Sequence, residues 1–327
     1  MNKIYSLFLL LFLPFISTAQ NPESVFIKEY HNYKIDTTIT IAVPFKNEFY
    51  CLKSNGQVIV IDKTNNKIDA SYKDNSKSIK LSDLIVKRDT LFGTGDSGTY
   101  FLNKNNQWAS LKKRFEQNNY TYEDEKFKVE STCSGEWGGS LYFIDKKTNE
   151  KYECTCTCAV NLIKKDDTYF VTASLSHMSG FTEIFQIKNP LKLKKYNRDN
   201  LIKRREDFKK KNPDKIYIGT IGDDESQSNV GKTILADSIG VTTAASFIYN
   251  SQIYYIVEKY KRVSIDIIKN KKLLPIEDIS SLNIWCDYPK SRTYNNQELT
   301  VFNNKDNSGF IFIEQNKLSF YIFNRHN

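Results

Sequence analysis

The sequence predicts an all-β protein built from repeated antiparallel hairpins. Short runs of alternating polarity recur along the chain, and turns rich in Asn, Gly, Asp and Lys separate them. Aromatic residues make up 13% of the 327 residues, and such side chains suit a pleated, half-buried surface. Because the composition is 40% hydrophobic and 26% charged, the chain can bury a core, which excludes a disordered protein.

The first residues are organised like a secretory signal peptide. Lys3 gives a short positive start, residues 4–16 are almost wholly apolar, and the small residues Ser17 and Ala19 follow. The apolar run is shorter than the ~20 residues of a membrane-spanning helix, and no later run is long enough. We therefore expect a signal peptide at 1-19, no transmembrane segment, and a periplasmic or secreted mature protein.

Hairpins can be assigned in order along the rest of the chain. Asn55-Gly56 lies between two apolar runs and is a strong hairpin signal, because both turn positions adopt positive φ. Asn250-Ser251 occupies the same place between two later runs. The expected strands cover residues 49–52, 58–61, 84–92, 99–102, 141–144, 151–158, 160–163, 169–171, 246–249, 253–257, 299–302, 310–313 and 318–323.

Positive charge is concentrated in one segment. The net charge is +9, and residues 192–211 contain ten Lys or Arg but only three Asp or Glu. Charge runs are usually solvated, so we interpret 192-213 as a basic insertion between β units, with a helix over 199–211. The alternative is a patch for an anionic envelope polymer or lipid surface. Export argues against a nucleic-acid partner.

Two segments match each other best, and they suggest a repeat. GQVIVIDKTNNKI (56–68) and GSLYFIDKKTNEKY (139–152) both place Ile-Asp-Lys before a turn containing Thr-Asn. This pattern resembles a blade of a β-propeller of the irregular bacterial exported type, and without a WD or kelch signature it identifies no specific family. The resemblance implies one β-propeller-like domain over 20-327, with about six or seven blades. The alternative is two β-sandwich domains divided near 190–215.

Three cysteines are the most distinctive residues of the chain. Cys154, Cys156 and Cys158 alternate with threonines, so on one strand their sulfurs would share a face. Three thiols could hold Cu(I) or Zn(II), but alternate strand residues are about 7 Å apart, unlike the converging Cys-x-x-Cys of zinc sites. Export favours disulfides. We rank a disulfide first, buried packing second and a metal third, with at most one disulfide and Cys133 as the favoured partner.

Two loops contain candidate ligand-binding residues. His177 lies among small and polar residues, and Glu136-Trp137 precedes two glycines and supplies an aromatic ring that could stack on a sugar. A propeller gathers such loops around its central funnel, the usual ligand site of the fold. We therefore name His177, Trp137 and Glu136 as candidates for binding an unknown protein or carbohydrate ligand. The alternative interpretation is that both are ordinary turns.

Catalytic motifs are incomplete. Residues 95–98 (Gly-Asp-Ser-Gly) match the nucleophile string of chymotrypsin-like proteases, but the sequence around His31 lacks the context of their histidine. Residues 231–233 end like a phosphate-binding loop, but Ser226 stands where that loop needs glycine. We assign no catalytic residue, cofactor or metal. The predicted function is an exported non-catalytic binding or scaffolding protein of the cell envelope. The alternative is an exported hydrolase with its active site in the central funnel.

Overall fold

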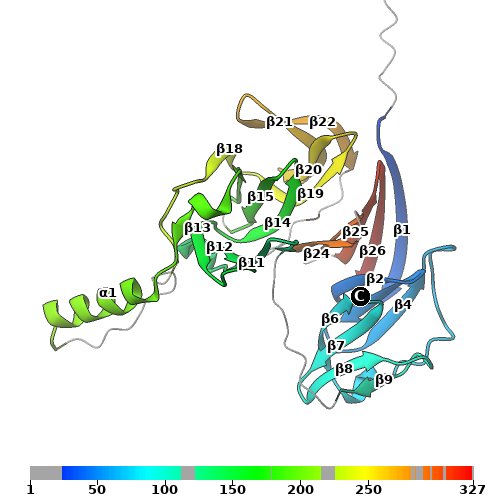
Figure 1. Ribbon diagram of the computed structural model, residues 1–327. Coiled ribbons are helices and arrows are strands. Elements are labelled where there is room, and N and C mark those ends of the chain that lie inside the picture. Colours follow the sequence, from blue (N-terminus) through cyan, green and yellow to red (C-terminus); the bar gives the residue numbers. More distant parts are fainter. Residues whose placement is uncertain are drawn as a thin grey trace, which may run out of the picture.

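The chain folds as a six-bladed β-propeller (Figure 1). The computed structural model describes residues 24–111, 122–177, 179–214, 225–280, 284, 290–294, 297–304 and 307–325. The predicted all-β, propeller-like fold is confirmed. The alternative of two β-sandwich domains is wrong, because the strands form six small sheets of four or five strands each. The predicted signal peptide, 1–19, lies outside the described residues.

Each blade takes most of its strands from one stretch of the chain. Blade 1 contains β2 (Ile39–Phe45), β3 (Glu48–Lys53), β4 (Val58–Asp62) and β5 (Lys67–Ile68). Blade 2 contains β6 (Leu81–Lys87), β7 (Thr90–Gly95), β8 (Gly98–Leu102) and β9 (Trp108–Ser110). Blade 3 contains β10 (Tyr122–Glu123), β11 (Phe127–Ser131), β12 (Ser140–Asp145), β13 (Lys151–Thr155) and β17 (Lys194–Lys195). Blade 4 contains β14 (Ala159–Lys165), β15 (Thr168–Leu175), β16 (Phe181–Ile187) and β18 (Thr233–Ile239). Blade 5 contains β19 (Thr242–Tyr249), β20 (Gln252–Lys259), β21 (Arg262–Lys269) and β22 (Lys272–Ser280). Blade 6 contains β23 (Lys290–Tyr294), β24 (Gln297–Asn303), β25 (Asn307–Glu314), β26 (Lys317–Arg325) and β1 (Ile27–Ile35).

Blade 6 is built from both ends of the chain. The N-terminal strand β1 pairs in parallel with the C-terminal strand β26, from Ile27 opposite Lys317 to Ile35 opposite Arg325. The chain then passes directly into β2 of blade 1, so Figure 1 shows the red strands of blade 6 beside the blue strands. This non-local pairing ties blade 1 to the end of the chain.

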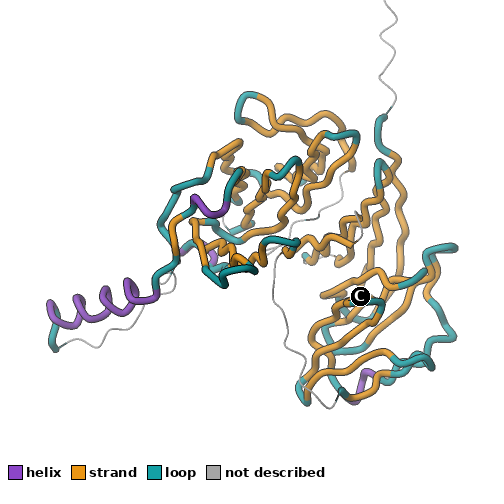
Figure 2. Tube along the Cα trace, in the orientation of Figure 1, coloured by secondary structure: helices purple, strands orange, loops and turns teal. Residues whose placement is uncertain are grey.

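The middle strands of the blades are apolar on both faces. In β25, Phe310 and Phe312 enter the core shared with blade 1, whereas Ile311 and Ile313 enter the core shared with blade 5. Because successive side chains of a strand point to opposite faces, an uninterrupted apolar run is what a strand between two neighbouring blades requires. The tube in Figure 2 shows how nearly all of the body is strand.

Five hydrophobic clusters join neighbouring blades. They lie between blades 1 and 2, 3 and 4, 4 and 5, 5 and 6, and 6 and 1. Phe49 of β3 is central to the last of these, with its ring centroid 5.0 Å from that of Phe310 and 4.9 Å from that of Tyr321. In the described part of the chain, no such cluster spans blades 2 and 3.

Both hairpins predicted from turn residues are present. Asn250 and Ser251 join β19 to β20 with φ of 45° and 60°, as a two-residue turn of the right twist requires. In the connection between β3 and β4, residues 54–57, Gly56 has a φ of 82° but Asn55 has no positive φ. The expected positive φ at both turn positions is therefore wrong for this hairpin. A Cβ on Gly56 would stand 2.9 Å from the Cα of Lys80, so glycine is needed for conformation and for space.

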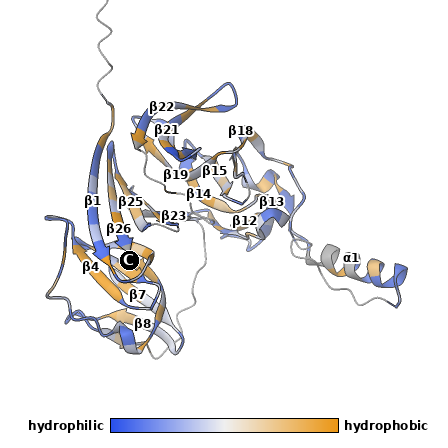
Figure 3. Ribbon diagram, turned by 180° about the vertical axis from the view of Figure 1, so that it is seen from behind, coloured by the Kyte–Doolittle hydropathy of each residue, from blue (hydrophilic) through white to orange (hydrophobic). Residues whose placement is uncertain are grey.

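The basic segment divides into two parts. Lys194 and Lys195 form β17 on the edge of blade 3, where Lys194 pairs with Glu153 at 3.5 Å. The helix α1 (Arg198–Lys211) follows close to the predicted 199–211 and stands apart from the sheets in both directions of view (Figures 1 and 3). Three short 3-10 helices complete the described structure: Ser76–Ser78, Gly135–Trp137 and Pro190–Lys192. None of the described helices combines the length and apolar character needed to cross a bilayer.

Two buried carboxyl groups lie in the C-terminal half of the propeller. Glu258 of β20 accepts a hydrogen bond from the Ile284 N–H at 2.9 Å, and burial raises its pKa to about 7. Burial likewise raises the pKa of Glu298 in β24 to about 7. The folded protein therefore retains protons on these groups at a pH where the unfolded chain has lost them.

The substitution Glu258→Gln tests this linkage. The folded pKa lies above the ordinary value of 4.5, so the free energy of unfolding of the wild type should fall as pH rises from 4.5 to about 7. The introduced amide cannot ionise and keeps an acceptor for the Ile284 N–H. We expect the variant to be more stable than wild type at about pH 8, by on the order of 2–3 kcal/mol, and no more stable near pH 4. Urea titrations across this pH range measure the difference, and a constant difference would contradict the prediction.

Candidate functional site

All three predicted binding residues lie at one end of blades 3 and 4. Neighbouring strands of a blade run in opposite directions, so the second-to-third connection and the crossing to the next blade lie at the same end. In blade 3 this end carries residues 132–139, between β11 and β12, and in blade 4 it carries residues 176–180, between β15 and β16. The crossing from β13 to β14, residues 156–158, lies between them.

The structure brings Glu136 and His177 into direct contact. The Nε2 of His177 lies 3.0 Å from Oε2 of Glu136, and both side chains are about half exposed. Trp137 follows Glu136 in the short helix Gly135–Trp137, and its side chain is 60% exposed. An imidazole, a carboxylate and an indole from two blades therefore form one surface, which we call the binding tip.

A buried carboxylate holds the binding tip from below. Glu225 is only 7% exposed and accepts hydrogen bonds from the hydroxyls of Thr132, Ser134 and Ser140. Two of these residues belong to the loop, and Ser140 begins β12. Hydrogen bonds to a charged acceptor in a water-poor site are strong, so Glu225 fixes both ends of the loop.

A disulfide also fixes the loop. Cys133 is bonded to Cys158, with Cα atoms 4.4 Å apart. The expected single strand over 151–158 is wrong, because β13 ends at Thr155 and Cys158 has φ of 57°. Since both bonded cysteines lie beyond the strand ends, β12 does not separate them.

The other two cysteines of the motif are packed in the core. Cys154 and Cys156 are fully buried free thiols between blades 3 and 4, and burial raises the pKa of Cys154 to about 12. A thiol with a raised pKa is a poor metal ligand and a poor nucleophile. Among the described residues, no group of three or more His, Cys, Asp or Glu is arranged to hold a metal ion.

Close backbone packing completes the support. A Cβ on Gly139 would lie 2.5 Å from the Cys156 carbonyl oxygen and 2.6 Å from that of Thr132, so only glycine fits between these segments. Gly138 has φ of 108° and ends the short helix. The binding tip is therefore exposed at its end and rigid at its base.

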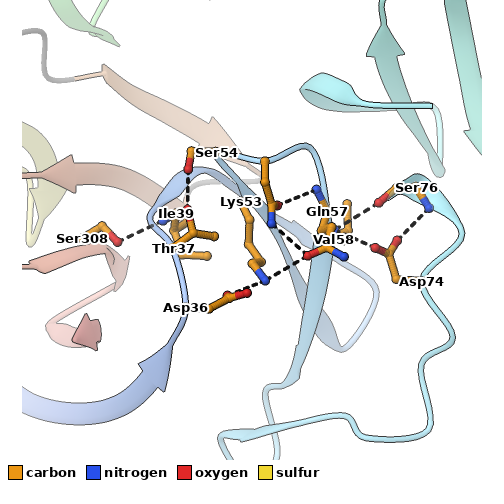
Figure 4. A network of polar contacts seen from close by, with 11 residues as sticks. Asp36, Thr37, Ile39, Lys53, Ser54, Gln57, Val58, Asp74, Ser76 and Ser308 are labelled. Atoms are coloured by element: carbon orange, nitrogen blue, oxygen red, sulfur yellow. Dashed lines mark hydrogen bonds and ion pairs between the residues drawn. The ribbon is translucent and has the colours of Figure 1, made fainter. Parts of the chain in front are cut away.

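The same end of blade 1 is built differently. There the ammonium of Lys53 binds Asp36 at 2.6 Å and donates to Gln57 at 3.1 Å, while Ser76 accepts from the Val58 N–H at 3.1 Å (Figure 4). These polar groups pair with one another within the loops and hold the strand ends together.

The two strings that resemble catalytic motifs have structural roles. Gly95 and Gly98 flank the turn between β7 and β8, an ordinary hairpin. Lys232 is 1% exposed at its side chain, pairs with Glu183 at 2.6 Å and lies 4.1 Å from the centre of the Phe185 ring. An ammonium held in this way anchors the segment before β18 on blade 4 and is not presented to a phosphate.

Sequence reasoning missed two residues near this end. Glu225 gives no local signal, because its hydroxyl partners are at least 85 positions away. Tyr260 is 81% exposed in the turn between β20 and β21. The sequence does contain a signal for Tyr260. An aromatic residue stands in a two-residue turn between strands, where Asn-Gly is the usual pair.

Comparisons with known proteins find only distant structural similarities. No protein-family model matches the sequence, and no curated protein matches it. Similar solved structures include the computationally designed protein Ika8, with 11% identity over 88% of each chain and a TM-score of 0.40. Another is BamB from Moraxella catarrhalis, with 8% identity over 84% of this chain and 82% of that chain and a TM-score of 0.34.

Removal of the disulfide should loosen the binding tip and destabilise the protein. The pair Cys133→Ser and Cys158→Ser opens a link across 25 positions, which constrains the unfolded chain by about 3 kcal/mol. We expect a loss of roughly 2–4 kcal/mol in the free energy of unfolding, measured by denaturant titration. Dithiothreitol should lower wild-type stability equally and leave the double variant unchanged. Wild-type stability that dithiothreitol does not alter would contradict the prediction.

Proposed function

We propose that this chain is an exported, non-catalytic binding or scaffolding protein of the cell envelope, and that it binds its ligand at Glu136, Trp137 and His177. The observation that carries the proposal is an exposed indole on a loop fixed by a disulfide and a buried carboxylate. A rigid aromatic group loses little conformational entropy on binding, which favours affinity.

Export is supported by the order of residues 1–19 and by the cysteine chemistry. A positive start, an apolar run and small residues before a cleavage site are typical of a signal peptide. The Cys133–Cys158 disulfide fits an oxidising compartment outside the cytoplasm.

Binding explains the site better than hydrolysis does. An imidazole next to a carboxylate can act as an acid–base pair, but a hydrolase also needs a nucleophile or an activated water in a water-poor site. Glu136 and His177 are half exposed, and the free thiols of blade 3 are buried in the core. The exposed neighbour of the pair is the Trp137 indole, a contact group without catalytic chemistry.

The substitution Trp137→Ala tests the binding proposal. Wild-type protein immobilised on beads should recover one partner or glycan from a detergent extract of the cell envelope, and the variant should recover about tenfold less or none. Ile27→Ala is the matched control, because Ile27 is also exposed but lies on β1 in blade 6. Equal recovery by Trp137→Ala and wild type, with intact folding by circular dichroism, would reject the site.

We also propose that the basic segment 192–211 contacts an anionic surface of the envelope. Lys194 and Lys195 are engaged on blade 3, which leaves the helix α1 as the accessible part. Lys209, Lys210 and Lys211 are all exposed in its last turn. A cluster of lysines on an extended arm attracts anionic headgroups at about 1 kcal/mol per residue.

Replacement of Lys209–Lys211 by Gln tests the arm. Three charges at about 1 kcal/mol each correspond to roughly a hundredfold weaker partitioning onto phosphatidylglycerol vesicles, measured by co-sedimentation. The matched control replaces Lys269, Lys271 and Lys272, which are equally exposed in the turn between β21 and β22. Equal losses in both variants would indicate net charge alone, and no wild-type binding would reject the proposal.

A further inference from the structure

The binding tip continues across blades 4 and 5 as one surface. His177 contacts Glu136, and the Gly180 N–H donates to the His177 carbonyl at 2.9 Å. The Gly240 N–H, in the turn between β18 and β19, donates to the Gly180 carbonyl at 2.9 Å. The Tyr260 hydroxyl lies 4.0 Å from the position of a Cβ on Gly240. A continuous series of contacts therefore links Trp137 to Tyr260.

This surface concentrates exposed apolar side chains. Ile239 and Tyr260 are each 81% exposed, more than any other large hydrophobic side chain described, and Trp137 is among the next most exposed. Single exposed hydrophobic residues are common, but three on connected turns of three blades form a patch. Trp and Tyr are also the residues most enriched at the energetic centres of protein interfaces. We call Trp137, His177, Ile239, Tyr260 and Lys261 the three-blade patch.

The turn at Tyr260 has a backbone conformation that is unfavourable for bulky residues. Tyr260 and Lys261 join β20 to β21 with φ of 51° and 63°. Elsewhere in the described residues, two-residue turns of this kind begin with Asn250, Asp166, Asn270 or Arg88. A bulky aromatic residue at positive φ is unusual, whereas Asn-Gly adopts the same turn readily. Such an outlier indicates a function for the side chain rather than for the fold.

The blade 5 end of the patch is positively charged. Lys259 and Lys261 flank Tyr260, and neither forms an ion pair with any residue in the described part of the chain. The nearby Arg262 pairs with Asp278 at 2.7 Å. The acidic groups of the patch lie at its other end, where Glu136 contacts His177 and the exposed Asp237 precedes Ile239 by two residues. Complementary charge therefore favours a partner segment that places an acidic residue at the Tyr260 end.

The polar centre of the patch favours a protein over a lipid surface. Burying the Glu136–His177 pair under acyl chains would remove its water without replacing the lost hydrogen bonds. A peptide can supply backbone donors and acceptors at that point. From these observations we infer that the three-blade patch docks an acidic protein segment carrying an aromatic or aliphatic anchor, with the anchor between Trp137 and Tyr260. The inference rests on the proposed binding function and names its partner.

A phage-displayed library of random dodecapeptides, selected on the folded chain, tests the partner class. We expect enriched peptides to combine Asp or Glu with Phe, Trp, Leu or Ile, and the affinity of a selected peptide to fall with added salt. Enrichment of basic or purely polar peptides, or no enrichment over uncoated beads, would overturn the inference.

The variant Tyr260→Asn/Lys261→Gly separates docking from stability. The preferred turn residues should raise the unfolding midpoint by about 2–4 °C, while the Kd of the selected peptide should rise about tenfold or more. The matched control is Lys271→Gly, which gives the turn between β21 and β22 of blade 5 the same Asn-Gly pair, with Asn270 as its first residue. This control should leave peptide binding unchanged. Unchanged peptide affinity in Tyr260→Asn/Lys261→Gly would overturn the inference.

Other occupants of the patch give distinct results, each of which overturns the inference. Loss of binding to phosphatidylglycerol vesicles in Tyr260→Asn/Lys261→Gly, without peptide binding in wild type, would indicate a lipid surface. Loss of self-association in sedimentation would indicate a second copy of the chain. If this variant recovers the envelope partner normally while Trp137→Ala does not, the proposed binding function stands and the three-blade patch is rejected. Normal recovery by both variants rejects both proposals.

Discussion

The parallel pairing of β1 with β26 is the interaction on which the propeller depends. It places the N-terminal strand in blade 6, so that the chain enters blade 1 from the position where the C-terminal blade ends. The aromatic cluster around Phe49, Phe310 and Tyr321 then buries the junction of the two blades. Within the described residues no hydrophobic cluster joins blades 2 and 3, whereas this junction joins blade 1 to blade 6.

This organisation separates stability from function along each strand. Apolar side chains on both faces of the middle strands bind neighbouring blades together, and none of them is available to a ligand. The connections at the strand ends do not take part in this packing between blades, so they can vary in sequence. In blade 1 they are joined by polar contacts such as Lys53 with Asp36, whereas in blades 3 to 5 they present Trp137, Ile239 and Tyr260 to solvent.

Local patterns predicted the parts of the structure that local physics determines. Asn250-Ser251 forms the expected two-residue turn, and the six blades lie within the expected six or seven. The single strand expected over 84–92 is wrong, because Arg88 and Asp89 adopt positive φ and divide it into β6 and β7. The end of β13 at Thr155 could not be read from Cys-Thr alternation, because it depends on the close approach of Gly139 from another strand. The role of Glu225 could not be predicted for the same reason, because its hydrogen-bond partners Ser134 and Ser140 are distant in sequence.

A polar network determines how blades 4 and 5 lie against blade 6. Asn161 of blade 4 donates to a carboxyl oxygen of Glu298 in blade 6 at 3.1 Å and to the Ser246 carbonyl of blade 5 at 3.1 Å. Ser246 returns a hydrogen bond to the Asn161 carbonyl oxygen at 3.0 Å. Apolar contacts tolerate sliding, but hydrogen bonds are directional, so a satisfied buried network fixes a single arrangement. The turns that bear His177, Ile239 and Tyr260 extend from these same blades. The network between the blades and the hydrogen bond from the Gly240 N–H to the Gly180 carbonyl therefore both hold these turns in place.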